Sequence, residues 1–181
     1  MRNPFLIGPA VYLRPLELDD AATILPWFND PEVTRLLRRC RPITLAEEQE
    51  FLQRLRSAET EVRFGIALRE ADQLIGTAGL RGIDDRNRHS EFGISIGEKQ
   101  HWGKGHGTEA TGLVMRYAFQ TLNLNRLWLH VYEYNARAIR VYEKLGFRVE
   151  GRLRQDTFRE GRYWDTLVMG VLREEVERVD Y

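Results

Sequence analysis

Length, composition and charge exclude several classes of protein at the outset. The chain has 181 residues, about one domain, and its hydrophobic and charged fractions of 43% and 30% are ordinary for a globular protein. With 27 basic and 27 acidic residues its net charge is zero, which does not favour nucleic acid or an anionic membrane as a partner. Cys40 is the only cysteine, so an intramolecular disulfide is impossible. We expect a single domain over residues 1–181, cytoplasmic and without a membrane span.

The N-terminal part predicts a strand followed by a first helix. The strand covers residues 11–16. Asp19 or Asp20 is expected to cap the helix, and Pro26 to kink or divide it. The Asn-Asp-Pro sequence at residues 29–31 then interrupts the chain.

The middle of the chain predicts a second helix and then a sheet. Thr44 and Glu47 form a capping box, which marks the start of that helix. Residues 63–69 and 73–81 have the pattern of a hairpin pair. The alternating run at residues 90–96 predicts a further strand, which leads into a glycine-rich turn.

This turn is the most informative stretch of the sequence. Gly103, Gly105 and Gly107 follow the strand, and apolar residues at helical spacing begin at Ala110. Glycines let backbone N–H groups converge at a helix start, where the helix dipole favours an anion, so the turn predicts a phosphate or pyrophosphate site. The Walker loop does not fit, because no hydroxyl residue follows Lys104, and the Rossmann spacing does not fit either. A strand-to-helix turn without a ligand is the alternative.

The C-terminal part predicts three more strands and one helix. Residues 126–132 are rich in β-forming residues, and residues 135–145 carry an apolar stripe at helical spacing. Gly146 is expected to end that helix in the left-handed conformation. Residues 147–154 and 163–172 predict two closing strands.

Two motifs in this arrangement resemble the Gcn5-related N-acetyltransferases (GNAT). The first is Gln-x-x-Gly-x-Gly, formed by Gln100, Gly103 and Gly105, and the second is the segment 135–147, which comes after the next strand as it does in that family. Similarity to the branch that contains ribosomal-protein N-terminal acetyltransferases and spermidine acetyltransferases lies in residues 13–16, 27–33 and 161–165.

The resemblance implies a mixed α/β fold. Its central sheet would be mixed but mostly antiparallel, with about six to seven strands and about four flanking helices. The sheet would splay between its fourth and fifth strands, here residues 90–96 and 126–132. Acetyl-CoA would enter this gap, with its pantetheine arm beside the fourth strand and its pyrophosphate on the glycine turn. The residues that the resemblance assigns to the cofactor are Ile94, Ser95, Ile96, Gln100, Gly103, Lys104, Gly105, His106, Gly107, Thr108 and Asn135.

Acetyl transfer to an amine also requires proton transfers. The ammonium must lose a proton before attack, and the departing thiolate must gain one. The resemblance places Tyr142 near the sulfur as the acid, and Glu91 is the best candidate for a base acting through water. The alternatives are a core tyrosine and an ion-paired strand carboxylate, and Asn135 would serve equally as a helix N-cap.

These motifs predict an acetyl-CoA-dependent N-acetyltransferase, in which a primary amine attacks directly in a ternary complex. We expect the acceptor to be a peptide N-terminus, because the acidic residues near residues 27–41 are matched by arginines. A polyamine or another small amine is the alternative, and a non-catalytic acyl-CoA sensor is the alternative of another class. Residues 27–41 and 158–164 are expected to select the acceptor, and a homodimer is the expected assembly.

Two further groups of residues have side chains of the kinds that bind anions or metals. Four arginines could contact an acidic acceptor or the 3′-phosphate of the cofactor, or else form a solvated helix face. They are Arg35, Arg38, Arg39 and Arg41. The four histidines show no spacing typical of metal ligands, so no metal is expected. They are His89, His101, His106 and His130.

Overall fold

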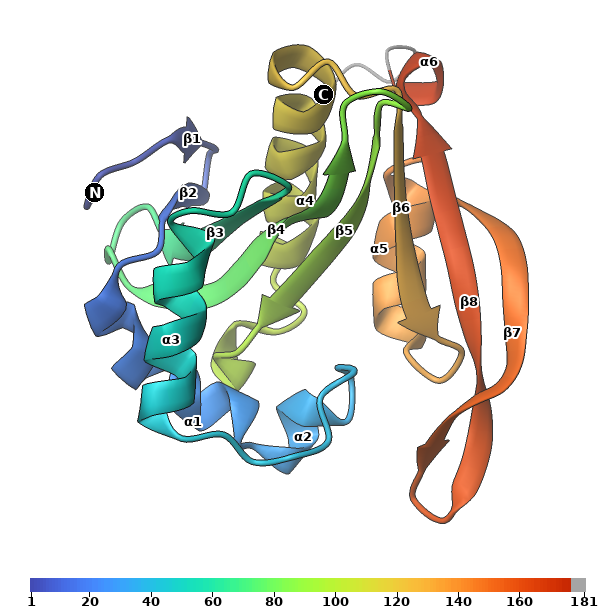
Figure 1. The fold of residues 1–181 in the computed structure, drawn as a ribbon, viewed down its shortest axis with the longest axis horizontal. Coiled ribbons are helices and arrows are strands. Elements are labelled where there is room, and N and C mark those ends of the chain that lie inside the picture. Colours follow the sequence, from blue (N-terminus) through green and yellow to red (C-terminus); the bar gives the residue numbers. More distant parts are fainter. Residues whose placement is uncertain (177–181) are drawn as a thin grey trace.

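A computed structural model describes residues 1–176 of the chain. These residues form an eight-stranded sheet with the order β1-β2-β3-β4-β5-β6-β8-β7 (Figure 1). All neighbouring strands are antiparallel except β5 and β6, which are parallel. The strands are Leu6–Ile7 (β1), Val11–Pro15 (β2), Glu61–Leu68 (β3), Leu74–Asp84 (β4), His89–Ile96 (β5), Arg126–Tyr132 (β6), Arg148–Arg159 (β7) and Arg162–Leu172 (β8).

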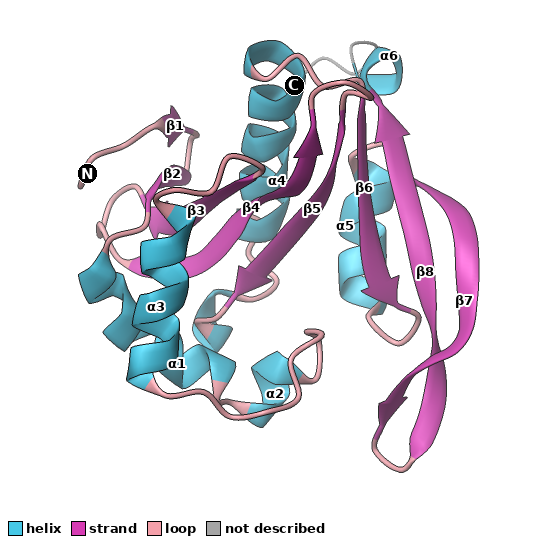
Figure 2. Cartoon of the chain, in the orientation of Figure 1, coloured by secondary structure: helices cyan, strands magenta, loops and turns pink. Residues whose placement is uncertain are grey.

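Helices cover both faces of this sheet (Figure 2). Helices α4 and α5 pack on one face, and α1 to α3 lie on the other, with α3 against β3. The α-helices are Ala21–Phe28 (α1), Pro31–Thr34 (α2), Leu45–Leu55 (α3), His106–Arg116 (α4), Ala136–Lys144 (α5) and Arg173–Val176 (α6). The described residues thus hold one strand and two helices more than expected, and β1, α2 and α6 have only two to four residues each. None of the helices in residues 1–176 is long and apolar enough to cross a membrane.

The sheet splays where the sequence predicted it. Strands β5 and β6 pair only at His89↔Arg126, Ser90↔Leu127 and Glu91↔Trp128. Beyond Glu91 the two strands separate, and the gap between them widens toward the end of β5 (Figure 1). These strands are the predicted fourth and fifth, so the expected splay is confirmed.

Most predicted helix boundaries are confirmed. The capping box holds the start of α3, since Thr44 Oγ1 accepts from the Glu47 amide at 3.3 Å and Glu47 Oε2 accepts from the Thr44 amide at 2.7 Å. Asp30 caps α2, with Pro31 in its first turn. Pro26 does not divide α1, which runs through it. In so short a helix a proline removes a single hydrogen-bond donor.

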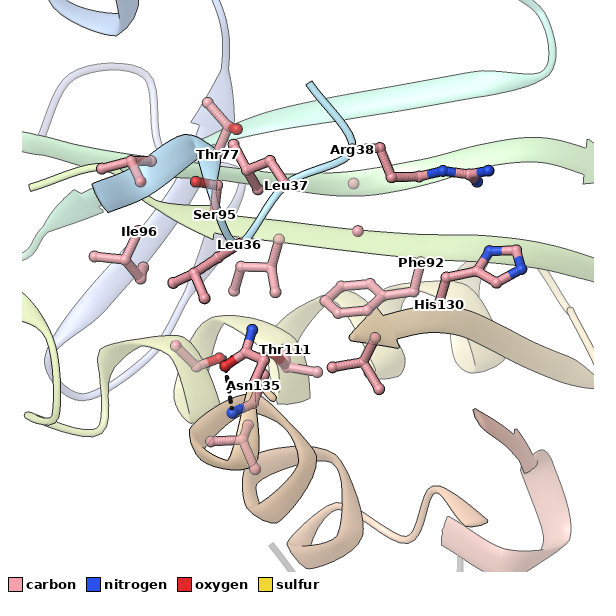
Figure 3. Close-up of a pocket in the computed structure, with 18 of the residues that line it drawn as sticks. Leu36, Leu37, Arg38, Thr77, Phe92, Ser95, Ile96, Thr111, His130 and Asn135 are labelled. Atoms are coloured by element: carbon pink, nitrogen blue, oxygen red, sulfur yellow. Dashed lines mark hydrogen bonds between the residues drawn. The ribbon is translucent and has the colours of Figure 1, made fainter. Parts of the chain in front are cut away.

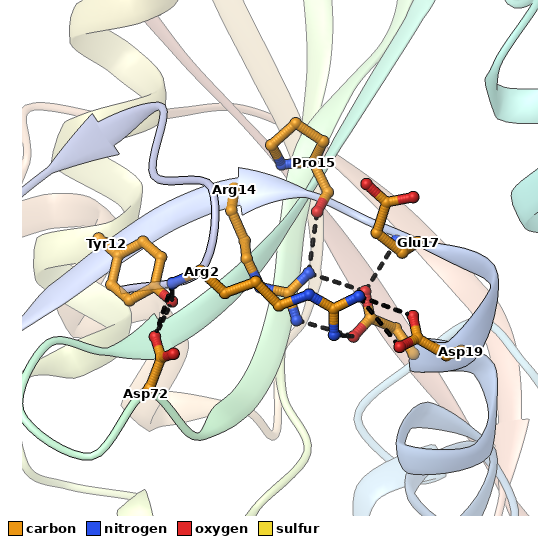
Figure 4. Close-up of polar contacts among 8 residues, drawn as sticks. Arg2, Tyr12, Arg14, Pro15, Glu17, Asp19 and Asp72 are labelled. Carbon is orange, nitrogen blue, oxygen red and sulfur yellow. Dashed lines mark hydrogen bonds and ion pairs between the residues drawn. The ribbon is translucent and has the colours of Figure 1, made fainter.

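The expected side-chain cap at Asp19 or Asp20 is wrong. Asp20 stands at the N-cap position of α1 but forms no side-chain cap hydrogen bond, and the Asp19 carboxylate has another partner (Figure 4). Asp20 is buried and accepts two hydrogen bonds from Arg14, at 2.7 and 2.8 Å, and one from the Glu17 amide at 2.8 Å. Asp19 pairs with Arg2 on the surface. The Asp20 carboxylate thus pairs with the buried Arg14 and, through the Glu17 amide, caps the short 3₁₀ turn Leu18–Asp20 rather than α1 itself.

The main core lies between the sheet and helices α4 and α5. Along α4 the side chains of Ala110, Leu113 and Val114 are buried, as the helical spacing predicted. They pack with Phe92 of β5 and Leu129 of β6 in one cluster. This cluster holds α4 and α5 beneath the two strands that diverge, so the core positions the gap.

Candidate active site

A cavity of about 780 Å³ opens where β5 and β6 separate (Figure 3). Successive side chains of β5 alternate between its two sides: Ile94 and Ile96 pack against the core beneath α4, and Glu91 and Ser95 face the α1 to α3 layer. We call the part lined by Ile94, Ile96, Gly103, Gly105, Thr108, Asn135 and Tyr142 the α4 side of the cavity. We call the part lined by Arg38, Glu48, Arg63, Arg81, Glu91 and His130 the α3 side.

The glycine turn forms the entrance to the α4 side. Gly103 and Gly105 have φ of +74° and +86°, a conformation that favours glycine, and Gly105 is the N-cap of α4. The first helical hydrogen bond runs from the Glu109 amide to the Gly105 carbonyl at 3.0 Å. The amides of His106, Gly107 and Thr108 therefore have no partner within the helix. These convergent donors, together with the helix dipole, are groups that could hold an anion.

The loop side chains contribute less than the backbone. Gly107 and Thr108 line the cavity, whereas Gln100, Lys104 and His106 are not among its lining residues. Burial, with smaller effects from the nearby Lys104 and His106 charges, lowers the pKa of His101, so this imidazole adds little positive charge at neutral pH. The groups that the turn offers to a ligand are therefore mainly its N–H groups.

The β5 edge of the gap is only partly free. In the register with β4, Ser95 lies opposite Thr77, and the amide of Gly97 donates to Ile75 of β4. Since backbone groups alternate along a strand, those of Ile94 and Ile96 point away from β4, toward the gap. The Ile96 carbonyl accepts a hydrogen bond from the Trp102 indole at 2.7 Å. Ile94 is left with the free backbone edge.

Asn135 lies at the N-terminus of α5 and faces the cavity (Figure 3). Its side-chain oxygen accepts from the Ala138 amide at 3.2 Å, so the N-cap interpretation is confirmed. The cap uses only the oxygen, which leaves the side-chain NH₂ as a donor for a ligand. The two roles are therefore compatible.

Tyr142 is placed by the end of the same helix. The amides of Gly146 and Phe147 donate to the carbonyls of Glu143 and Tyr142, both at 3.0 Å, and Gly146 has the predicted left-handed φ of +91°. The Tyr142 ring packs against Phe92 and Phe147. Burial raises the pKa of Tyr142, so its hydroxyl stays protonated at neutral pH. No described residue hydrogen-bonds this hydroxyl, and Tyr142 lines the cavity.

Glu91 lies at the last pair before the strands separate. Arg81 donates two hydrogen bonds to its carboxylate, at 2.6 and 2.8 Å, and His130 Nδ1 lies 3.2 Å from Oε1. Burial alone would raise the pKa of Glu91, but the hydrogen bonds from Arg81 and His130 outweigh burial and lower it. The expected ion pair of Glu91 is thus confirmed. Because its pKa is lowered, its carboxylate is a weaker base than that of an ordinary glutamate.

From the sequence, His130 is one of four histidines without metal-ligand spacing and has no other expected role. On β6 the side chains of Leu129 and Val131 are buried in the core, so His130 between them faces the α3 side. This alternation was readable, but the contact with Glu91 requires the pairing of β5 with β6. If Nδ1–H donates to Glu91, Nε2 keeps its lone pair on the cavity side.

The two segments expected to select the acceptor meet at the mouth of the α3 side. Arg159, at the tip of the β7–β8 hairpin, donates to the carbonyls of Leu37 and Arg39 at 3.3 Å each. Arg35 forms an ion pair with Glu160 of the same hairpin at 3.2 Å. The four arginines do not form a helix face, because α2 ends at Thr34 before all of them.

Metal ligation finds no support in this arrangement. Within residues 1–176, no three His, Cys, Asp or Glu side chains come together in a way that could hold a metal ion.

Comparison with known proteins identifies the class that this fold and site define. The profile described as "Acetyltransferase (GNAT) domain" matches residues 10–148. The chain therefore belongs to the GNAT acetyltransferases and is an acyltransferase of that family.

Its relatives lie in the predicted branch. The chain is 34% identical over 166 residues to an uncharacterized N-acetyltransferase p20 of Bacillus licheniformis, covering 90% of this chain and 93% of that one. It is 33% identical over 165 residues to the spermidine N(1)-acetyltransferase of Escherichia coli, covering 91% and 87%. The structure of spermidine N-acetyltransferase from Vibrio cholerae in complex with CoA and spermine superposes with a TM-score of 0.85 at 29% identity, covering 93% and 98%.

Proposed function

We propose that this protein transfers the acetyl group of acetyl-CoA to a primary amine, and that the acceptor is the α-amine of a peptide. One observation carries the proposal: the unpaired amides at the start of α4 converge at the entrance of a cavity that passes between β5 and β6. A pyrophosphate needs such an anion site, and a thioester arm needs the gap beside it. In this arrangement the Ile94 backbone pairs with the arm and Asn135 donates its NH₂ near the thioester.

The proton transfers follow from the contacts around the gap. The neutral amine attacks the thioester carbon, the C–N bond forms and the C–S bond breaks, and the amide nitrogen then releases its second proton to solvent. Tyr142, kept protonated by burial, gives its proton to the departing sulfur. His130 Nε2 accepts the proton of the ammonium. Glu91 assists this step by holding the imidazole ring through its contact with Nδ1.

The charges on the α3 side favour a peptide over a polyamine. Glu61 and Glu91 are already paired, with Arg63 at 2.9 Å and Arg81 at 2.6 Å. Glu48 is buried, and desolvation raises its pKa despite the nearby arginines. A polyamine carries several positive charges and needs several free carboxylates. The spermidine acetyltransferase relatives nevertheless make a polyamine the second candidate.

The assembly is proposed to be a homodimer. The edge strand β7 exposes Val149, Leu153 and Phe158, with 52%, 41% and 54% of each side chain accessible. An open strand edge with apolar side chains favours pairing with another chain. Light scattering on the purified protein tests this, and a mass of one chain would contradict it.

Thermal melting and thiol release together test the function. Acetyl-CoA at about 100 times its dissociation constant should add ~2.7 kcal/mol to the free energy of unfolding. Thiol release should then require an amine, and should be faster with a short peptide than with spermidine. Stabilisation without thiol release from any amine would favour the sensor, and no stabilisation at millimolar acetyl-CoA would rule out both.

A further inference from the structure

Arg38 lines the α3 side of the cavity, and its side-chain contacts differ from those of Arg35 and Arg39. Arg35 is paired with Glu160, and the guanidinium of Arg39 lies 4.9 Å from the centre of the Phe28 ring. Arg38 has neither an ion pair nor a hydrogen bond to any residue between 1 and 176, and its side chain extends along the cavity (Figure 3). A guanidinium that lines a cavity without a partner is able to bind an anion.

The backbone on both sides of Arg38 is held in place. Arg159 donates hydrogen bonds to the carbonyl of Leu37 and to the carbonyl of Arg39, the two residues that flank Arg38. Tyr134 adds a hydrogen bond to the Arg35 carbonyl at 2.5 Å. The segment is therefore fixed by contacts with the β7–β8 hairpin and the β6–α5 region, while the exposed side chain of Arg38 lines the cavity. This preorganisation lowers the entropic cost of binding at Arg38.

Positive side chains outnumber carboxylates around Arg38, since eight Arg and Lys residues line the cavity against four Asp and Glu residues. Glu61 and Glu91 on the same side are neutralised by Arg63 and Arg81. Glu48 on α3 is buried, and burial raises its pKa. Asp156 on β7 lines the cavity without an ion pair to any residue between 1 and 176, but it is one carboxylate among many cations. The net charge that the cavity lining offers to an acceptor is therefore positive.

We propose that Arg38 binds a carboxylate of the acceptor, so that the preferred substrate is a peptide with an acidic side chain next to its N-terminal residue. This inference rests on the proposed acetylation of a peptide amine and adds its specificity. The amine lies at the gap between β5 and β6, and the carboxylate lies further out on the α3 side against Arg38. A polycation would meet the same guanidinium as a repulsive charge.

The experiment compares three C-terminally amidated peptides that differ only at their second residue: Glu, Gln or Lys. With the unaltered protein, kcat/KM should be about 10-fold higher for Glu than for Gln, and lower still for Lys, because charge-assisted hydrogen bonds are strong. Arg38→Gln should remove the preference and Arg38→Glu should reverse it. Arg41→Glu is the matched control, since Arg41 is exposed on the same segment and does not line the cavity.

The outcomes separate the inference from the proposed function. Equal rates for the three peptides would overturn the role of Arg38 and leave peptide acetylation standing. Turnover of spermidine alone, or of no amine, would overturn the proposed peptide acceptor and the Arg38 inference with it. If Arg38→Gln weakens binding of CoA but not of dephospho-CoA, Arg38 binds the 3′-phosphate and the inference is wrong. An Arg159→Ala variant should lose part of the preference for the Glu peptide over the Gln peptide, and an unchanged preference would contradict the positioning of Arg38 by Arg159.

Discussion

The two sides of the cavity offer a ligand different groups: main-chain amides on the α4 side and charged side chains on the α3 side. On the α4 side the donors proposed for the pyrophosphate are main-chain N–H groups within a single stretch, from Gly103 to Thr108. The α3 side is formed by side chains from β3, β4, β5, β6 and the segment after α2. On the first side the binding groups are common to any sequence that adopts the turn, whereas on the second each group is a particular residue.

This difference explains how one fold serves several acceptors. A backbone site needs only the correct φ values, so it binds the part of the substrate that all such enzymes share. A side-chain site changes with each substitution, so it is where specificity is expected to differ between relatives. Substitutions on the two sides should therefore have different consequences, and the following predictions run from the largest expected effect to the smallest.

Gly105→Val should abolish cofactor binding. The positive φ of +86° strains any β-branched residue, and the added side chain occupies open space at the entrance of the α4 side. Loss of two charge-assisted hydrogen bonds lowers affinity about 10²-fold or more, measured by CoA titration calorimetry. Gly82→Val is the control, because Gly82 has a φ of +60° with equally open space but does not line the cavity. Equal losses of CoA affinity in both variants would contradict the assignment.

Tyr142→Phe should lower kcat and leave binding intact. Removal of a general acid costs about 10²–10⁴-fold in rate, while the ring contacts with Phe92 and Phe147 remain. Because no described residue hydrogen-bonds the hydroxyl, the melting temperature should hardly change. Tyr117→Phe is the control: burial also raises the pKa of Tyr117, which does not line the cavity. A rate within a few-fold of the parent would mean that Tyr142 is not the acid.

His130→Gln should produce a rate defect that depends on pH. At pH 7 kcat/KM should fall about 10- to 100-fold, and the defect should shrink above about pH 8, where a peptide α-amine is already neutral. A purely structural role would give a defect that does not change with pH. His89→Gln serves for comparison, since His89 lies on β5 outside the cavity lining.

Glu91→Gln should slightly lower the free energy of unfolding at neutral pH, and this difference from the parent should disappear in acid. The pKa of Glu91 is lowered below its ordinary value of 4.5, so the carboxylate stabilises the folded protein above that value and loses this effect as the pH falls through the folded pKa. The exposed Arg81 partner limits the effect to about 0.5–1 kcal/mol at neutral pH. Urea unfolding at several pH values measures it, with Glu143→Gln as the reference. A difference that grows toward low pH would contradict the sign.

Local sequence determined much of this protein. The capping box of Thr44 and Glu47, the left-handed Gly146 and the glycine turn at Gly103 and Gly105 were all readable, because each depends on residues within a few positions of one another. The order of strands and helices, and the splay, followed from the family resemblance that these stretches carry. The amine acceptor, the acid and the base remain predictions.

Only the tertiary structure decided which charged side chains are free. Asp20 was expected to cap a helix, but Arg14 on β2 takes its carboxylate. Glu91 was readable as a strand residue, but its contacts with Arg81 and His130 come from two other strands. Arg38 is one of four arginines in its segment. Only the fold shows that it lines the cavity and has no partner among the described residues. Each of these pairs joins residues on different elements of the fold, and local patterns carry no information about which partner is close enough to bind.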